Sequence, residues 1–145
     1  RRQTEHFFEA ATHLEFISSK DNEEAGITLI QNNTHHYDLF IRKKKDQYIV
    51  QLRVKIGSHE YIASEKLLES NKINLKIIGE PLHYTFYYTE NDTNEYKELG
   101  KLDTRYLSTE VAGGFTGVMI GLYASSNGET SNAKAYYDWF DYIVQ

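Results

Sequence analysis

Residues 48–56 read Tyr-Ile-Val-Gln-Leu-Arg-Val-Lys-Ile, and the dipeptide Gly57-Ser58 follows them directly. From Tyr48 onward every second side chain is apolar, and polar side chains fill most of the positions between them. A period of two is typical of a β-strand with one buried face, because successive side chains point to opposite faces. A pair that contains glycine after such a strand predicts a tight hairpin. This stretch therefore indicates an antiparallel β-sheet.

The same alternation recurs along the rest of the chain. Further strands are predicted at residues 8–16, 25–31, 36–42, 60–64, 73–77, 84–88, 96–102, 118–124 and 135–144. Residues 67–71 are expected to form a short helical turn or an irregular link, and residues 103–116 a long loop. A parallel sheet is disfavoured, because no crossover helices separate the strands. We predict an all-β protein, with one antiparallel two-sheet β-sandwich or jelly roll over residues 1–145.

The composition limits both the fold and the function. The chain has 12 Tyr and 7 Phe residues with a single Pro, which favours β-structure. Its net charge of -5 argues against nucleic-acid binding, which needs a basic surface. The absence of Cys excludes disulfides, thiolate metal sites and a cysteine nucleophile, and it is compatible with a cytoplasmic location. No apolar run is long enough to span a membrane, so we expect neither a membrane nor nucleic acid as partner.

A glycine-rich segment is the first candidate functional site. Residues 113–117 read Gly-Gly-Phe-Thr-Gly, and an apolar strand follows at once. Glycine admits backbone conformations that other residues avoid, and it lets neighbouring groups approach closely. Phe115 has little local packing between such residues, so something else must cover its ring. We predict that Gly113, Gly114, Phe115 and Thr116 form a functional loop; the alternative is that Phe115 only closes one end of the sandwich.

The densest aromatic segment covers residues 136–142, which read Tyr-Tyr-Asp-Trp-Phe-Asp-Tyr. Alternation would place Tyr136, Phe140 and Tyr142 on one face of a strand, with Tyr137 and Trp139 on the other. We expect one set in the core and the other on the surface, where it would bind a glycan or a neighbouring domain. The candidates for that glycan or interface role are Tyr136, Trp139, Phe140 and Tyr142.

Neither a catalytic set nor a metal-binding set is evident. Asp138 and Asp141 are three positions apart in a predicted strand, so they point to opposite faces and cannot form the facing acid pair of a glycosidase. Asp138 would instead cap a turn, bind an ion or pair with Arg105. His36 and Asp38 share a face, but no third ligand is evident, which favours a surface pair over a metal site. We expect no catalytic residue and no metal ligand in this chain.

Several segments, spread in order over nearly the whole chain, carry a family resemblance. They are Arg1-Arg2-Gln3, Glu24-Ala25-Gly26-Ile27 with Gln31-Asn32, Tyr106-Leu107-Ser108-Thr109-Glu110, Gly113-Gly114-Phe115-Thr116-Gly117, Ile120-Gly121-Leu122-Tyr123-Ala124 and Tyr137-Asp138-Trp139-Phe140-Asp141-Tyr142. With these segments the chain resembles the C-terminal domain of glycoside hydrolase family 43 β-xylosidases and α-L-arabinofuranosidases. The resemblance implies a concanavalin A-like sandwich behind a five-bladed β-propeller that carries the catalytic carboxylates. That propeller is absent from this sequence, which we therefore interpret as a C-terminal fragment of a longer glycoside hydrolase.

The resemblance also implies a function. In this family the loop that corresponds to residues 113–117 reaches toward the propeller pocket, where its aromatic residue, here Phe115, helps to close the wall around the terminal sugar. The chain is then a non-catalytic domain of a xylan-degrading enzyme of the xylan 1,4-β-xylosidase type. Its expected partners are the catalytic β-propeller of the same polypeptide and a xylo- or arabino-oligosaccharide. Such sandwiches sometimes hold calcium, for which Asp138 is the candidate, and a bacterial cytoplasm or periplasm is favoured over the extracellular space.

Two other functions stay open at this point. An independent carbohydrate-binding module would bind glycans on an aromatic platform, and an oligomerisation domain would form homo-oligomers through a sheet face. The tyrosines available for such a platform are Tyr37, Tyr48, Tyr61, Tyr84 and Tyr87. The module would bind free glycans and the oligomerisation domain would self-associate, whereas an accessory domain would do neither by itself.

Overall fold

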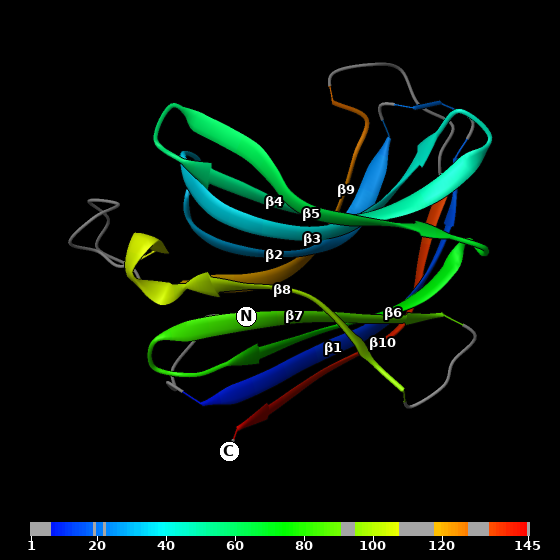
Figure 1. Ribbon diagram of the computed structural model, residues 1–145. Helices are drawn as coiled ribbons and strands as arrows, with labels where there is room; N and C mark the ends of the chain where they lie inside the picture. Colours follow the sequence, from blue (N-terminus) through cyan, green and yellow to red (C-terminus); the bar gives the residue numbers. More distant parts are fainter. Residues whose placement is uncertain are drawn as a thin grey trace.

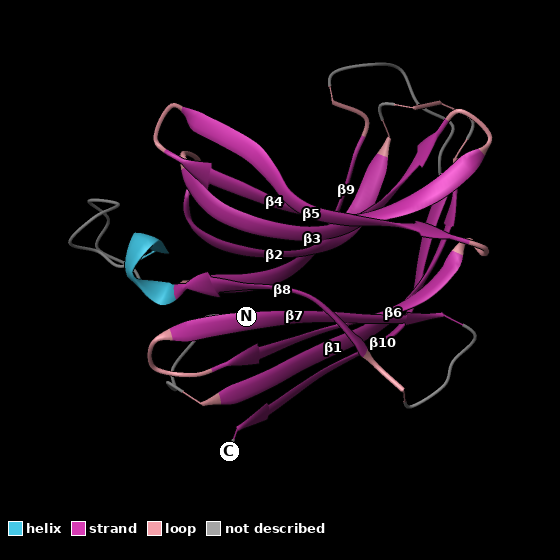
Figure 2. Cartoon of the chain, viewed as in Figure 1, coloured by secondary structure: helices cyan, strands magenta, loops and turns pink. Residues whose placement is uncertain are grey.

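The computed structural model describes residues 7–18, 20–21, 23–90, 95–107, 118–127 and 134–144. Within these residues the chain is built almost entirely of β-strands, which lie in two layers (Figure 1 and Figure 2). The strands are β1 (Phe8–Ile17), β2 (Glu24–Asn32), β3 (His35–Lys44), β4 (Gln47–Ile56), β5 (His59–Leu68), β6 (Lys72–Gly79), β7 (His83–Glu90), β8 (Lys97–Asp103), β9 (Met119–Ser125) and β10 (Lys134–Val144). One 3-10 helix, η1 (Thr104–Leu107), directly follows β8.

The strands form two five-stranded sheets. Sheet I has the order β10-β1-β6-β7-β8, and sheet II has the order β5-β4-β3-β2-β9. Every strand pair within them is antiparallel. Hairpins join β2 to β5 in sequence within sheet II and β6 to β8 within sheet I. The links from β1 to β2, β5 to β6, β8 to β9 and β9 to β10 pass from one sheet to the other. The predicted antiparallel two-sheet sandwich is confirmed.

The core lies between the inner faces of the two sheets. The alternation that predicts the first strand is realised in β1, where Phe8, Ala10, Leu14 and Phe16 are buried. They pack with apolar side chains from the inner face of sheet II, and this continuous core includes Ile27, Leu29, Tyr37, Leu39, Ile41, Val50, Leu52 and Val54. Burial of these alternating positions is the main force that holds the two sheets face to face.

Two predicted boundaries are wrong. The expected turn or link at residues 67–71 is partly strand, because β5 runs to Leu68, which pairs with Tyr48 of β4. β5 is an edge strand with mostly exposed side chains, so backbone pairing extends it where no hydrophobic alternation marks it. The predicted loop at residues 103–116 begins too early, because Asp103 is the last residue of β8 and the ordered turn of η1 follows it directly.

Candidate functional site

The glycine-rich segment itself, residues 113–116, lies outside the described residues, but both of its flanks are described. On one side η1 ends at Leu107, whose side chain is fully buried, and on the other Val118 leads into β9 with 9% exposure. The hydroxyl of Tyr37, at the start of β3, donates a hydrogen bond of 2.6 Å to the backbone carbonyl of Asp103, just before η1. Residues 108–117 therefore connect sheet I to sheet II between two flanks that are packed into the core.

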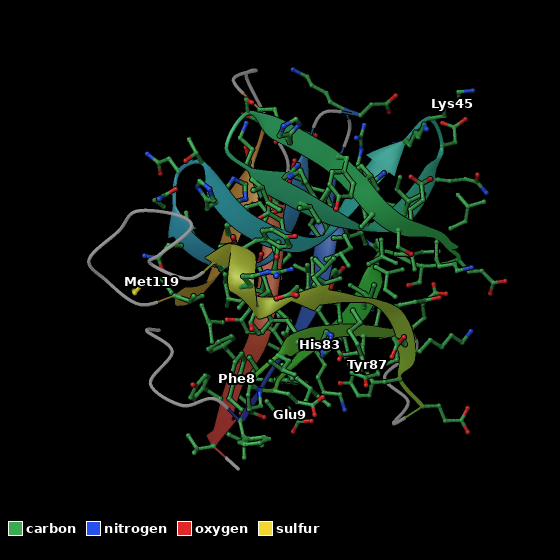
Figure 3. All side chains as sticks on the ribbon, turned by 60° about the vertical axis from the view of Figure 1, so that its left-hand side comes forward. Phe8, Glu9, Lys45, His83, Tyr87 and Met119 are labelled. Carbon is green, nitrogen blue, oxygen red and sulfur yellow. The ribbon has the colours of Figure 1, made fainter. Side chains whose placement is uncertain are left out.

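Exposed apolar side chains surround these flanks. The backbone amide of Thr104 donates to the carbonyl of Leu82 at 3.1 Å, so the β6–β7 turn lies beside η1. Leu82 is 71% exposed, Tyr106 is 36% exposed and Met119, labelled in Figure 3, is 42% exposed. We call this end of the sandwich, defined by Leu82, Tyr106 and Met119, the loop end. Isolated exposed apolar residues are ordinary, but their grouping beside one loop is typical of a contact surface.

The aromatic strand β10 departs from simple alternation. Its pairing with β1 shifts between His13 and Leu14, which face Trp139 and Tyr137 respectively, so Asp138 is an extra residue in a β-bulge. A one-residue bulge interrupts the alternation of the strand, so the two residues that flank the bulge point to opposite faces of the sheet. The prediction that Tyr137 and Trp139 share a face is therefore wrong, because Tyr137 packs against the core whereas Trp139 lies on the outer side.

The bulge sorts the aromatic candidates into two groups. Phe140 and Tyr142 pack against the core together with Tyr137, and the ring of Tyr142 stacks on Phe8 with a centroid separation of 5.4 Å. Trp139 and Tyr136, which alternation would place on opposite faces, are both accessible, with exposures of 37% and 48%. Among the candidates at residues 136–142, only Tyr136 and Trp139 are free to contact a ligand.

Asp138 takes a partner that the sequence did not predict. Its carboxylate lies 3.5 Å from Nε2 of His13 on β1, whereas Arg105 lies 3.4 Å from Asp103. Pairing of Asp138 with Arg105 is therefore wrong. Within the described part of the chain, no group of three His, Asp or Glu side chains is placed to hold a metal ion.

The predicted tyrosine platform is not assembled. Tyr37 and Tyr84 are in the core, with 1% and 3% exposure, and their rings meet edge to face. Tyr48 also packs against the core, whereas Tyr61 is 53% exposed on the edge strand β5. Tyr87 lies on the outer side of sheet I (Figure 3), so these five rings do not share one face.

A network of charged side chains covers the outer face of sheet II. Arg53 of β4 binds both carboxylate oxygens of Glu24 at 3.0 and 2.7 Å, and its Nε donates to Asp38 at 2.8 Å. The predicted pair of His36 and Asp38 is present at 2.9 Å, but Asp38 is buried, with a side-chain exposure of 4%. Tyr123 of β9 donates its hydroxyl to Glu24 at 2.5 Å. These groups line a hollow of about 210 Å³.

The network keeps both carboxylates charged. Burial alone would raise the pKa of Glu24, but hydrogen bonds from Arg53 and Tyr123 hold that pKa below its usual value. Burial acts in the same way on Asp38, where the hydrogen bond with His36 and the charge of Arg53 lower the pKa. The opposite charges account for the burial of both acids without a ligand. In the sequence Arg53 is one of the polar residues on the outward face of its alternating strand, beside Gln51 and Lys55, so the pattern of β4 did not distinguish it.

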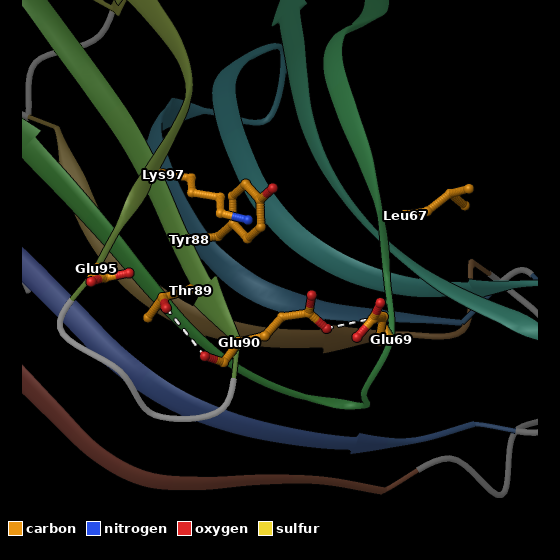
Figure 4. Close-up of a pocket in the computed structure, with 7 residues that line it drawn as sticks. All are labelled: Leu67, Glu69, Tyr88, Thr89, Glu90, Glu95 and Lys97. Carbon is orange, nitrogen blue, oxygen red and sulfur yellow. Dashed lines mark hydrogen bonds between the residues drawn. The ribbon is translucent and has the colours of Figure 1, made fainter.

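A larger hollow, of about 400 Å³, is drawn in Figure 4. It lies opposite the loop end, because Lys97 is at the start of β8 and η1 follows the other end of that strand. Leu67, Tyr88, Glu90 and Lys97 are among the residues that line it. The carboxylate of Glu90 accepts hydrogen bonds from the backbone amides of residues 69 and 70, at 2.7 and 3.0 Å. This carboxylate therefore holds the turn between β5 and β6, which is a structural role.

The sequence and the fold agree with one known family of domains. Residues 1–143 match the family model of the glycoside hydrolase family 43 β-xylosidase C-terminal concanavalin A-like domain. The chain belongs to this family.

Relatives of this β-xylosidase C-terminal domain are parts of longer proteins. The chain is 34% identical, over 98% of its length, to a non-reducing end α-L-arabinofuranosidase from Bacteroides ovatus, and 37% identical, over 96% of its length, to a xylosidase/arabinosidase from Butyrivibrio fibrisolvens. It spans 27% of the length of each. The solved structure of the GH43B protein of a Bacteroides ovatus xyloglucan locus superimposes with a TM-score of 0.93 and 34% identity, over 100% of this chain and 29% of that one.

The family assignment agrees with the sandwich that the resemblance implies. The domain matches the C-terminal portion of its longer relatives, as an accessory domain of a glycoside hydrolase does. Among the residues that the structure describes, no helix has the length and hydropathy to cross a lipid bilayer.

Proposed function

We propose that this domain completes the sugar pocket of a family 43 catalytic domain in the same polypeptide, through the loop at residues 113–116. The observation that carries the proposal is the packing of both flanks of that loop, at Leu107 and Val118. Flanks that are packed into the core fix where the segment between them begins and ends, which favours a positioning role. The curated relatives, a non-reducing end arabinofuranosidase and a xylosidase/arabinosidase, support a substrate with a terminal pentose.

The chemistry of the proposed role needs only an aromatic wall. A pocket that accepts the end of a sugar chain must be closed on most sides, and an aromatic ring packs on the apolar C–H face of a pentose while it excludes water. Phe115 is the aromatic residue available in the loop. The two carboxylates that hydrolyse the glycosidic bond would come from the catalytic domain, and this domain would contribute no reacting group.

The loop end supplies a surface for that catalytic domain. Leu82, Tyr106 and Met119 are exposed beside the loop flanks, and they would be covered when the catalytic domain docks there. In this arrangement, docking of the catalytic domain on the loop end also brings the loop to the sugar pocket, so the same contact closes the pocket. The proposed partners are accordingly the catalytic domain and a xylo- or arabino-oligosaccharide in its pocket.

The test is Phe115→Ala in a polypeptide that carries this domain behind its catalytic domain. We expect kcat/KM for aryl β-xyloside and aryl α-L-arabinofuranoside to fall by roughly tenfold or more, because the aromatic wall is lost. The melting temperature should stay unchanged. The matched control is Leu67→Ala, which removes an exposed apolar side chain at the opposite end of the sandwich and should leave the kinetics unchanged.

Unchanged kinetics for Phe115→Ala would overturn the proposal. The two alternative functions give different results. An oligomerisation domain would sediment as a defined homo-oligomer that is lost when a sheet face is substituted. A carbohydrate-binding module would leave hydrolysis of small aryl glycosides unchanged in the Phe115 variant and would reduce only the activity on polymeric xylan.

A further inference from the structure

A hollow on the outer face of sheet I surrounds one small residue, Ala11 of β1. Ala11 pairs with Asp141 of β10 on one side and with Lys76 of β6 on the other. Ala11 is 9% exposed, and it does not belong to the apolar cluster between the sheets. Neighbouring outward-facing positions carry larger side chains, including Trp139 and Ile143. Because the side chain of Ala11 is smaller than those around it, a hollow of about 190 Å³ lies above this residue.

Two aromatic side chains stand at opposite sides of this hollow, which we call the Ala11 hollow. Trp139 lines it from β10, and Tyr96 lines it from the segment just before β8. Trp139 takes this place only because the bulge at Asp138 turns it outward. The indole is 37% exposed, so a ligand can reach it.

Charged groups complete the lining. Nζ of Lys76 lies 3.3 Å from Oε1 of Glu9 and 3.9 Å from the ring centroid of Tyr96, so it is held between a carboxylate and an aromatic face. Glu9 lies on the outer side of sheet I (Figure 3). The carboxylate of Asp141 makes no hydrogen bond or ion pair with another described residue. It is therefore available to accept hydrogen bonds from a ligand.

These groups discriminate between ligand classes. A cation is disfavoured, because the ammonium of Lys76 already occupies the aromatic face of Tyr96. An anion is disfavoured, because Glu9 and Asp141 outnumber the single lysine. An apolar side chain would bury these charges without replacing their contacts with water.

A neutral ring with hydroxyl groups on its edge fits the hollow. Its apolar face would pack on Trp139, and its hydroxyls would donate to Asp141 and accept from Lys76. A volume of about 190 Å³ is below the range of pockets for drug-sized ligands and suits one sugar ring.

We propose that the Ala11 hollow is a binding subsite for a single sugar ring of a neutral β-1,4-linked xylan chain. The choice of xylan rests on the proposed function, whereas the sugar class rests on the hollow itself. This subsite lies on the outer face of sheet I and includes none of residues 113–116, so it would hold polymeric substrate at a second point. One small contact predicts weak binding, with a Kd on the order of 1 mM.

The test uses the fluorescence of Trp139, which is the single Trp of the 145-residue chain. We expect xylohexaose to change this fluorescence in a saturable manner. The decisive variant is Ala11→Leu, which fills the floor of the hollow and keeps the fluorophore, and it should weaken binding by about tenfold or more. The matched control is Ile17→Ala, which removes an exposed apolar side chain at the end of the same strand β1 that is not part of the lining and should bind like the unsubstituted chain.

Two results would overturn the proposal: no saturable change in the unsubstituted chain up to about ten times the expected Kd, or equal affinity in the Ala11→Leu variant. A response to tetramethylammonium but not to xylohexaose would identify a cation site and would equally reject it. Thermal melts of both variants establish that they fold. Phe115→Ala should leave the titration unchanged, so this test and the kinetic test of the loop can fail independently.

Discussion

Arg53 and Glu24 form a two-pronged ion pair across the outer face of sheet II, with N–O distances of 3.0 and 2.7 Å. The two residues are 29 positions apart, on strands that are separated by β3. Asp38, on that middle strand, binds the same guanidinium. One arginine thus neutralises two buried carboxylates and ties three strands of the sheet together.

Removal of Arg53 should destabilise the domain strongly. Arg53→Leu leaves Glu24 and Asp38 buried without the guanidinium that they share, so we expect a loss of about 3–5 kcal/mol in the free energy of unfolding. Urea denaturation measures this loss. Lys55→Leu, on the same strand, is the matched control and should cost below about 1 kcal/mol. A loss of that smaller size for Arg53→Leu would contradict the structural role of the network.

The same network predicts acid sensitivity. Partners lower the pKa of Glu24 from its usual 4.5 and that of Asp38 from its usual 3.8. Lowered pKa values in the folded state contribute stability that is complete above the unfolded values and is lost as the pH falls through the folded ones. We therefore expect the urea midpoint to be stable at neutral pH and to fall steadily below about pH 4.5.

Two glutamine variants test the source of this acid sensitivity. Glu24→Gln should flatten the acid limb of the stability profile, because one of the shifted carboxylates is gone. Glu60→Gln, an exposed position on β5, serves as the control and should keep the full slope. If the slopes of both variants equal that of the unsubstituted chain, Glu24 does not carry the effect.

A close approach between β2 and β3 requires glycine at position 26. A Cβ atom there would lie 2.6 Å from the Cα of Phe40 and closer still to the carbonyl oxygen of Leu39. Because both obstacles are backbone, Gly26→Ala should cost about 1–3 kcal/mol or more. Gly121→Ala, on the neighbouring strand β9, meets no atom within 4 Å and should be nearly neutral in thermal denaturation. Equal melting temperatures for the two variants would show that the strands separate without cost.

The β10 bulge predicts opposite behaviour for two adjacent tyrosines. Tyr137 packs against the core, and its hydroxyl donates to the carbonyls of Tyr123 and Gly26 in sheet II, at 2.5 and 3.3 Å. Tyr137→Ala should therefore cost about 2–4 kcal/mol. Tyr136→Ala, at an exposed position, should change stability by below about 0.5 kcal/mol. If the losses were reversed, simple alternation without a bulge would be the correct register.

Strand prediction succeeded where one face of a strand is buried. In β4 the apolar positions Val50, Leu52 and Val54 all enter the core, because the period of two leaves only one way to bury them. The end of β5 was missed, because an edge strand with exposed side chains carries no such pattern. The bulge at Asp138 was missed for a related reason, since it arises from pairing with His13 and Leu14 on a strand far away in sequence.

Some of the candidate sites could likewise be predicted from the sequence, and one could not. The glycine-rich segment and the aromatic segment were visible in the sequence, because residue type alone marks a Phe between glycines or a cluster of aromatic residues. The Ala11 hollow was not visible, because it combines an absence of bulk on β1 with side chains from β6, β10 and the segment before β8. An alanine in a strand does not by itself predict a hollow, because the hollow depends on the side chains that surround the alanine.

The amino-acid sequence by itself determined the class of fold, the number of layers and the family, since these follow from local periodicity and from motifs that are contiguous in the chain. Only the tertiary structure decided which aromatic rings of β10 face outward, which acids Arg53 neutralises and where Ala11 leaves space. The physical reason is the range of the interactions involved. Periodicity is a property of one strand, whereas a bulge, an ion-pair network or a hollow depends on the register between strands that are distant in the sequence.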